Sequence, residues 1–137
     1  MSIVTDSRVV AFVEQRIGGK VWNPCTAVGL ERDGVIVAGA IYERCNGCNV
    51  FFHGAANDSR TWASREFLHA LMSHPFETLR VPRMTTVVAA SNAEALAFDA
   101  GLGFVEECRL AGAAHDGGDS IYLVMWKKDC RWLNLKF

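Results

Sequence analysis

This chain of 137 residues is as informative in what it lacks as in what it contains. No stretch approaches the roughly 20 consecutive apolar residues of a membrane-spanning helix. The N-terminus, Met-Ser-Ile-Val-Thr-Asp, has neither the basic start nor the apolar run of a signal peptide. There is no run of Lys or Arg, and the formal net charge is −1, so an electrostatic footprint for tight nucleic-acid binding is missing. We therefore expect a cytoplasmic protein that does not bind membranes. Nucleic acid is not the expected partner, although the sequence does not exclude a local basic face formed on folding.

Motifs for well-known catalytic and metal sites are also missing. The sequence has no G-x-S-x-G, H-E-x-x-H or Walker pattern. Cys45-Asn46-Gly47-Cys48 has the spacing of metal ligands, but a zinc site needs two more, and no second pair accompanies it. Cys25, Cys108 and Cys130 are isolated. We predict no bound metal and reduced thiols, as is typical of a cytoplasmic protein.

The composition that remains is that of a globular protein. Half of the residues are hydrophobic and 21% are charged, which excludes a disordered chain. The length suits one hydrophobic core, and no repeat or linker divides the sequence. We therefore expect a single domain over residues 1–137.

Periodicity and turn signals predict the elements of the first half. Thr5 or Asp6 can cap a helix whose apolar residues run from Val9 to Ile17, and Gly18-Gly19 ends it. Asp33-Gly34 and Asn46-Gly47 are hairpin signals. They predict antiparallel strands at Thr26–Glu31, Val35–Glu43 and Asn49–Ala56. A helix follows over Ala63–Ser73, ended by His74-Pro75, with a loop from Phe76 to Pro82.

The stretch from Arg83 to Arg109 organises the second half as strand, helix and strand. Met84–Ala90 is β-branched and apolar, which predicts a strand buried on both faces. Ser91 and Glu94 form an S-x-x-E capping box. Gly101 and Gly103 are expected to end the helix before the chain returns through Phe104 and Val105. A last strand is predicted over Ile121–Trp126, and we expect Trp126 and Trp132 to seal either the core or a homo-oligomer contact.

These residues carry a family resemblance. The set that resembles the second half of a GCN5-related N-acetyltransferase (GNAT) is Asn92, Ala95, Leu96, Phe98 and Leu102-Gly103-Phe104. The tail with Asp116-Gly117-Gly118-Asp119 is similar to the closing hairpin of short phage- and prophage-borne members. The resemblance implies an α+β, GNAT-like (acyl-CoA N-acyltransferase) fold: a mixed, mostly antiparallel sheet of about six strands with helices on both faces. The chain is shortened at its N-terminus, because the usual first strand is missing or reduced to Ile3-Val4.

The same resemblance implies acetyl-CoA as the cofactor. It would lie between the Asn49–Ala56 and Met84–Ala90 strands, where amides near Ala55 and Ala56 polarise the thioester carbonyl and Asn92 contacts the cofactor. In the family a loop that reads Q/R-x-x-G-x-G/A holds the pyrophosphate at a helix N-terminus. The corresponding residues here are Ser59, Arg60, Thr61, Trp62, Ala63 and Ser64, followed by Arg65.

This loop departs from the family pattern. Trp62 replaces the first glycine, and it either obstructs a phosphate or packs inward and leaves the amides free. Arg60 and Arg65 can supply the charge that the motif residue, now Ser59, does not. The alternative is that both are surface arginines on an ordinary helix start.

The catalytic residues are less clearly indicated. The family often has a tyrosine that protonates the thiolate, and Asp99 stands at that position. An ionised aspartate cannot donate a proton, although burial would raise its pKa. We favour the alternative that Asp99 is solvated or pairs with an arginine. Candidates for a general base are Glu43 and His53, the latter equally interpretable as a structural histidine.

The leading hypothesis is transfer of an acetyl group from acetyl-CoA to a primary amine, on a small molecule or protein that the sequence does not identify. Trp62 and Asp99 favour an alternative, a catalytically inactive GNAT-shaped protein that serves in binding or assembly. A third hypothesis is a related enzyme that transfers a group to a nucleobase.

Overall fold

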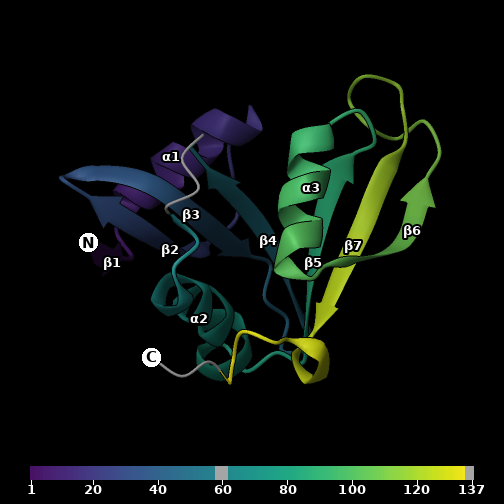
Figure 1. The fold of residues 1–137 in the computed structure, drawn as a ribbon. Coiled ribbons are helices and arrows are strands. Elements are labelled where there is room, and N and C mark those ends of the chain that lie inside the picture. Colours follow the sequence, from purple (N-terminus) through teal and green to yellow (C-terminus); the bar gives the residue numbers. More distant parts are fainter. Residues whose placement is uncertain (58–61, 135–137) are drawn as a thin grey trace.

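A computed structural model describes residues 1–57 and 62–134, whose strands form one mixed sheet (Figure 1). The seven described strands lie in the order β1-β2-β3-β4-β5-β7-β6. Their bounds are β1 Ser2–Val4, β2 Cys25–Arg32, β3 Val35–Glu43, β4 Asn49–Ala56, β5 Arg83–Ala89, β6 Val105–Leu110 and β7 Ser120–Trp126. Only β4 and β5 pair in parallel, and the other neighbours are antiparallel. The predicted mixed, mostly antiparallel sheet is confirmed, with one strand more than expected.

The first half of the chain follows the predicted pattern. Helix α1 spans Ser7–Ile17; the side chain of Asp6 accepts from the Arg8 amide at its start, and Gly18 ends it in the left-handed conformation. At the β2–β3 turn, Asp33 and Gly34 both have positive φ, as a tight hairpin of this kind requires. Strand β1 has three residues and pairs with β2.

Helices cover both faces of the sheet. Helix α1 packs on one face of β2, β3 and β4, and its Val9 lies directly over Gly29 and Gly39. A Cβ atom at Gly29 would lie 2.5 Å from Cγ2 of Val9, so only glycine allows this close approach. Helices α2 (Arg65–Ser73) and α3 (Ala93–Leu102) contribute to a cluster on the other face.

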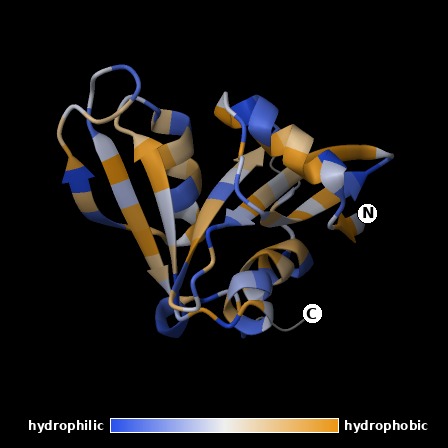
Figure 2. Ribbon diagram, turned by 180° about the vertical axis from the view of Figure 1, so that it is seen from behind, coloured by the Kyte–Doolittle hydropathy of each residue, from blue (hydrophilic) through white to orange (hydrophobic). Residues whose placement is uncertain are grey.

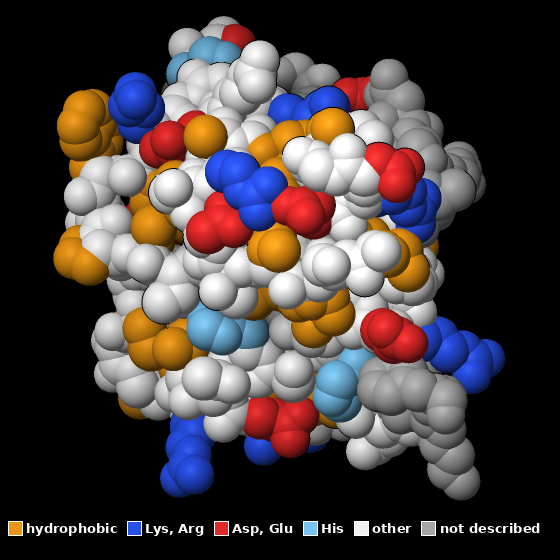
Figure 3. Space-filling view, turned by 90° about the vertical axis from the view of Figure 1, so that its left-hand side faces the viewer, with side chains coloured by type: hydrophobic (Ala, Val, Ile, Leu, Met, Phe, Trp, Pro, Cys, Tyr) orange, Lys and Arg blue, Asp and Glu red, His pale blue; other side chains and the backbone are white. Residues whose placement is uncertain are grey.

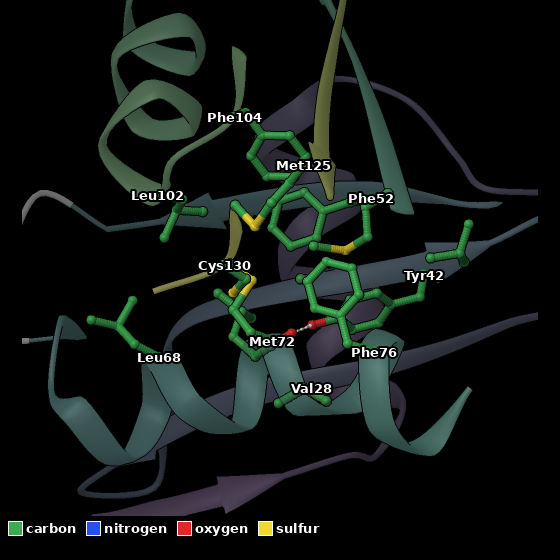
Figure 4. Close-up of a cluster of buried hydrophobic side chains, with 14 of the residues drawn as sticks. Val28, Tyr42, Phe52, Leu68, Met72, Phe76, Leu102, Phe104, Met125 and Cys130 are labelled. Atoms are coloured by element: carbon green, nitrogen blue, oxygen red, sulfur yellow. Dashed lines mark hydrogen bonds between the residues drawn. The ribbon is translucent and has the colours of Figure 1, made fainter. Parts of the chain in front are cut away.

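That cluster is the larger core of the molecule. Figure 4 shows side chains from the sheet and from α2 meeting there, among them Tyr42, Phe52 and Met72. The Tyr42 hydroxyl donates a hydrogen bond to the Leu71 carbonyl, which satisfies the one polar group that this tyrosine brings into the core. Cys130, from the segment after β7, closes the cluster, so the end of the described chain is packed onto α2.

Two local predictions are wrong. Helix α2 ends at Ser73, but His74–Thr78 continues as one π-helical turn instead of a loop. Pro75 has no amide hydrogen to donate, and the wider turn is closed by a hydrogen bond from the Leu79 amide to the His74 carbonyl. At α3 the cap is Asn92, whose side chain accepts from the Ala95 amide.

Ser91 has a different partner. Its hydroxyl donates to Asp116 in the turn before β7, 2.6 Å away, so the predicted Ser91–Glu94 capping box does not form. Gly101 lies inside α3, and Gly103 alone ends the helix, with a φ of 113°.

The two halves of the sheet differ in how they are covered. On the face seen in Figure 2, no helix of the described chain lies over β5, β7 and β6, whereas α1 covers β2, β3 and β4. At the opposite edge, near β1, acidic and basic side chains are interspersed (Figure 3), and Arg8 pairs there with both Asp6 and Glu31. No helix of the described residues is long and apolar enough to cross a membrane.

Candidate active site

The parallel strands at the centre of the sheet separate after a short contact. Strands β4 and β5 are in register only at Asn49↔Arg83, Val50↔Met84 and Phe51↔Thr85. Beyond these pairs β4 stays with β3 as far as Ala56, and β5 stays with β7 as far as Ala89. The two strands therefore form a fork that widens toward their C-terminal ends (Figure 1).

One edge of the fork consists of backbone groups. The Asn57 amide donates to the Val37 carbonyl, so its N–H points toward β3. Because successive amides of a strand point to alternate edges, the N–H groups of Gly54 and Ala56 face the fork, and that of Ala55 faces β3. Of the two predicted carbonyl polarisers, Ala56 has the better orientation.

Glu43 and His53 are brought together at the base of the fork, although they lie on different strands. The β3–β4 register pairs Ile41 with His53, which places Glu43 diagonally across from it on the same face of the sheet. His53 Nε2 lies 3.1 Å from Oε1 of Glu43. Asn23 donates to the other carboxylate oxygen at 3.4 Å.

The Glu43 carboxylate is buried and yet favours its charged form. Burial, the largest single effect, raises its pKa, but hydrogen bonds from His53 and Asn23 and the charge of Arg44 together lower the pKa below the ordinary value. In the neutral form of His53, a charged acceptor at Glu43 favours the tautomer with its hydrogen on Nε2, so the lone pair is on Nδ1.

Arg44 adjoins this pair and is held in place by three features. Its backbone is in the left-handed region, with a φ of 53°. Its Nε donates to Oε1 of Glu43 at 3.1 Å, the same oxygen that His53 contacts. Its guanidinium carbon lies 3.8 Å from the centroid of the Phe51 ring, a cation–π contact.

A polar network fastens the closed end of the fork. Oδ1 of Asn49 accepts from Arg83 Nε at 3.2 Å and from the Thr85 hydroxyl at 2.7 Å. Both Nη atoms of Arg83 donate to Glu107 on β6, at 2.8 and 2.9 Å. No local pattern points to these residues, since they meet only through the strand pairing.

Asp99 is in a different environment from the one we favoured. Only 3% of the residue is exposed, and within the described chain its carboxyl group has neither a hydrogen-bond partner nor an arginine. Burial raises its pKa to about 7. The interpretation as a solvated residue is therefore wrong, and no arginine of the described residues pairs with Asp99. The alternative, a carboxyl group whose pKa is raised by burial, is the one that fits. Tyr42, engaged in the core, does not take its place.

Trp62 packs inward. Its ring centroid lies 5.1 Å from that of Phe98 on α3 and 6.4 Å from that of Phe67 on α2. Phe98 in turn lies on Gly54, where a Cβ atom would be 2.8 Å from the Phe98 ring. An aromatic pair therefore links the start of α2 to β4 beside the fork.

The remaining candidates divide between described and undescribed residues. Arg60 and Thr61 lie outside the described residues. Ser64 caps α2 by accepting from the Phe67 amide, and Ala63 and Arg65 are exposed beside it. Asn92 is exposed and engaged as the cap of α3. Among the described residues no group of three or more potential ligands is placed to hold a metal ion.

Comparison with known proteins gives the fold a name. No family model and no curated protein matches the chain. Solved structures do: a mutant of the spermidine N-acetyltransferase SpeG from Vibrio cholerae has a TM-score of 0.75 at 15% identity, and the match covers 98% of both chains. A structure of mutant forms of the spermidine/spermine N-acetyltransferase SpeG from the same organism gives 0.74 at 15% identity, covering 97% of each chain.

A probable acetyltransferase gives a TM-score of 0.62 at 18% identity, covering 78% of this chain and 63% of that one. These likenesses show the fold: a GNAT-like acyl-CoA N-acyltransferase fold, as the sequence resemblance implied.

Proposed function

We propose that this protein is an acetyl-CoA-dependent N-acetyltransferase that acts on a primary amine. The observation that carries the proposal is the fork between β4 and β5. Along one side it has the amides of Gly54 and Ala56, which have no strand partner among the described residues, and near its base it has the Glu43–His53 pair. The fold of proteins described as N-acetyltransferases supports it.

The residues around the fork fit the cofactor's two polar parts. An extended arm with amide groups suits a strand edge, where the N–H of Gly54 and Ala56 can donate to it. The N-terminus of α2, which begins at Arg65 after the cap Ser64, is a helix end of the kind that suits a phosphate, and Arg60 precedes it in the sequence. When bound, acetyl-CoA supplies the acetyl group as an activated thioester.

Each chemical role falls to a residue with a suitable environment. His53 Nδ1 takes a proton from the amine, and the Glu43 carboxylate stabilises the resulting imidazolium through Nε2. The Ala56 amide donates to the oxygen on which negative charge develops. Asp99, whose pKa is raised by burial, would give its proton to the departing thiolate.

A second candidate function, that of a binding or assembly protein without acetyl transfer, is favoured by one contact. Trp62 lies against Phe98, and Phe98 lies on Gly54, so the pair occupies the space beside the strand edge. If these rings keep their positions, they restrict the approach of an arm to the β4 edge from the side of α3.

Thermal unfolding in the presence of CoA separates the two candidates. A ligand at a hundred times its dissociation constant stabilises the fold by about 2.7 kcal/mol. For a chain of this length we expect a rise in Tm on the order of 2–8 °C per kcal/mol. Pantetheine should shift the Tm less than CoA, and replacing Arg60 and Arg65 together by Ala should weaken the shift, because charge-assisted contacts to phosphate are lost.

Substitution of Trp62 tests whether the Trp62–Phe98 pair prevents CoA from binding. If CoA stabilises Trp62→Ala but not the wild-type protein, the aromatic pair closes the site and the second candidate holds. The matched control is Trp22→Ala, since Trp22 is 86% exposed and far from the pair in the chain. Absence of a shift in both proteins would refute acetyl transfer.

A further inference from the structure

Arg44 has the geometry of a preorganised anion receptor. Its Nε donates a hydrogen bond to Glu43, and one face of its guanidinium is covered by the Phe51 ring. No residue in the described part of the chain bonds to its two Nη atoms, although the side chain is 48% exposed. The fork of N–H donors that remains is the geometry that binds a carboxylate in bidentate fashion.

The conformation of Arg44 is fixed before any ligand binds. A non-glycine residue with a φ of 53° is uncommon and costs free energy, so the surrounding contacts must hold it. Here the stacking on Phe51 and the bond to Glu43 orient the guanidinium. Because less side-chain entropy is lost on binding, such an arginine binds an anion more tightly than a freely rotating one.

Arg44 also lies next to the proposed base. His53 Nε2 and Arg44 Nε are each 3.1 Å from the same oxygen of Glu43, so the two side chains flank one carboxylate. The ring of His53 and the guanidinium of Arg44 therefore lie on either side of one carboxylate, an arrangement that suits a small acceptor with two functional groups.

Two carboxylates of the described residues near the fork are already engaged, which argues against a polycationic acceptor. Glu43 is shared by His53, Asn23 and Arg44. Glu107, at the closed end of the fork, accepts two hydrogen bonds from Arg83. Neither carboxylate is left to bind a second ammonium group.

Resting on the proposed acetyl transfer, we infer that the acceptor is an amine that also carries a carboxylate a few bonds away, as an amino acid does, and that Arg44 binds that carboxylate. Arg44 is then the residue that determines acceptor specificity, while His53 acts on the amine.

Matched acceptors test this inference directly. Phenylalanine and lysine would be compared with phenethylamine and cadaverine, which lack only the carboxylate. We expect the wild-type protein to prefer the carboxylated member of each pair. Arg44→Gln should raise KM for that member by about tenfold or more, with little change in kcat, since the bonds lost are to a charged group. KM for the decarboxylated amines should rise much less, since they lose no bond to Arg44, and Arg44→Lys should restore part of the loss.

The control is Arg109→Gln, because Arg109 is equally exposed, at 49%, and pairs with Glu106 on β6. If Arg44→Gln lowers kcat/KM equally for both members of a pair, Arg44 only positions Glu43 and the inference is overturned.

A binding measurement without turnover separates this inference from the proposed function. Calorimetric titration with N-acetylphenylalanine and N-phenethylacetamide needs no turnover. Tighter binding of the carboxylated compound, lost in Arg44→Gln, would support the inference even if no acetyl transfer is found. Equal binding of the two compounds would overturn it even if transfer is found.

Discussion

The buried carboxyl group of Asp99 should make the stability of this protein depend on pH in an unusual direction. Its pKa is about 7 in the folded state, against an ordinary value of 3.8. The folded protein therefore binds more protons than the unfolded chain between these values, and the free energy of unfolding falls as the pH rises from about 4 to about 7. Above about pH 8 the loss is complete and levels off.

The size of the effect follows from the shift. Each pKa unit corresponds to about 1.36 kcal/mol, so ionisation of Asp99 should cost about 4 kcal/mol of stability at alkaline pH, as an upper limit. Asp99→Asn has nearly the same shape and no charge. We expect the stability of the variant relative to the wild type to increase steadily between about pH 4 and pH 8. The difference in Tm should reach the order of 10 °C.

Denaturant or thermal unfolding from about pH 4 to pH 9 measures this difference. Asp129→Asn is the control, because Asp129 is exposed on the short helix after β7. Parallel stability curves for Asp99→Asn and the wild type would refute the reasoning, since they would mean that the carboxyl group is not desolvated in the folded protein.

Other predictions concern the base, the cysteines and the packing of α1. If acetyl transfer is detected, His53→Gln should lower kcat by about 10²–10⁴-fold at neutral pH, and a loss below tenfold would make His53 a structural histidine. Metal analysis of protein purified without chelator should find well under one zinc per chain, whereas stoichiometric zinc that disappears in Cys48→Ser would contradict the absence of a metal site. Gly29→Ala should destabilise the fold by about 1–3 kcal/mol, because the new methyl group meets Val9. Gly19→Ala, which meets nothing within 4 Å, should leave stability nearly unchanged in the same unfolding assay.

Elements specified by local chemistry could be predicted from the sequence. The Asp33-Gly34 turn adopts the positive φ angles that these residues tolerate, and the apolar stretch predicted as a strand forms β5. Its burial on both faces is only partial, since Val87 and Ala89 are half-buried. The cap of α3 could not be predicted, because Ser91 and Asn92 are both good capping residues. In the folded protein the Ser91 hydroxyl donates a hydrogen bond to Asp116, 25 residues away in the sequence, and Asn92 is the cap.

The same distinction holds for the candidate site. Glu43 and His53 could each be identified as titratable residues on strands, and their pairing follows from the hairpin register. No local sequence pattern indicated the role of Arg44, because its guanidinium is oriented by contacts with both Phe51 and Glu43. The burial of Asp99 is a property of the packed helix. In the sequence, an aspartate among the apolar residues of α3 fits an exposed position as well as a buried one.

The fork makes the sheet behave mechanically as two plates joined along one short seam. Three residue pairs connect the plate of β1–β4 to the plate of β5–β7, and beyond the seam the plates meet through side chains such as Phe98 on Gly54. Amide hydrogen exchange should therefore be slow where β5 pairs with β7 and faster at Gly54 and Ala56, whose free edge has no strand partner among the described residues. A molecule inserted between the plates would act as a wedge, and the angle between them would report its presence.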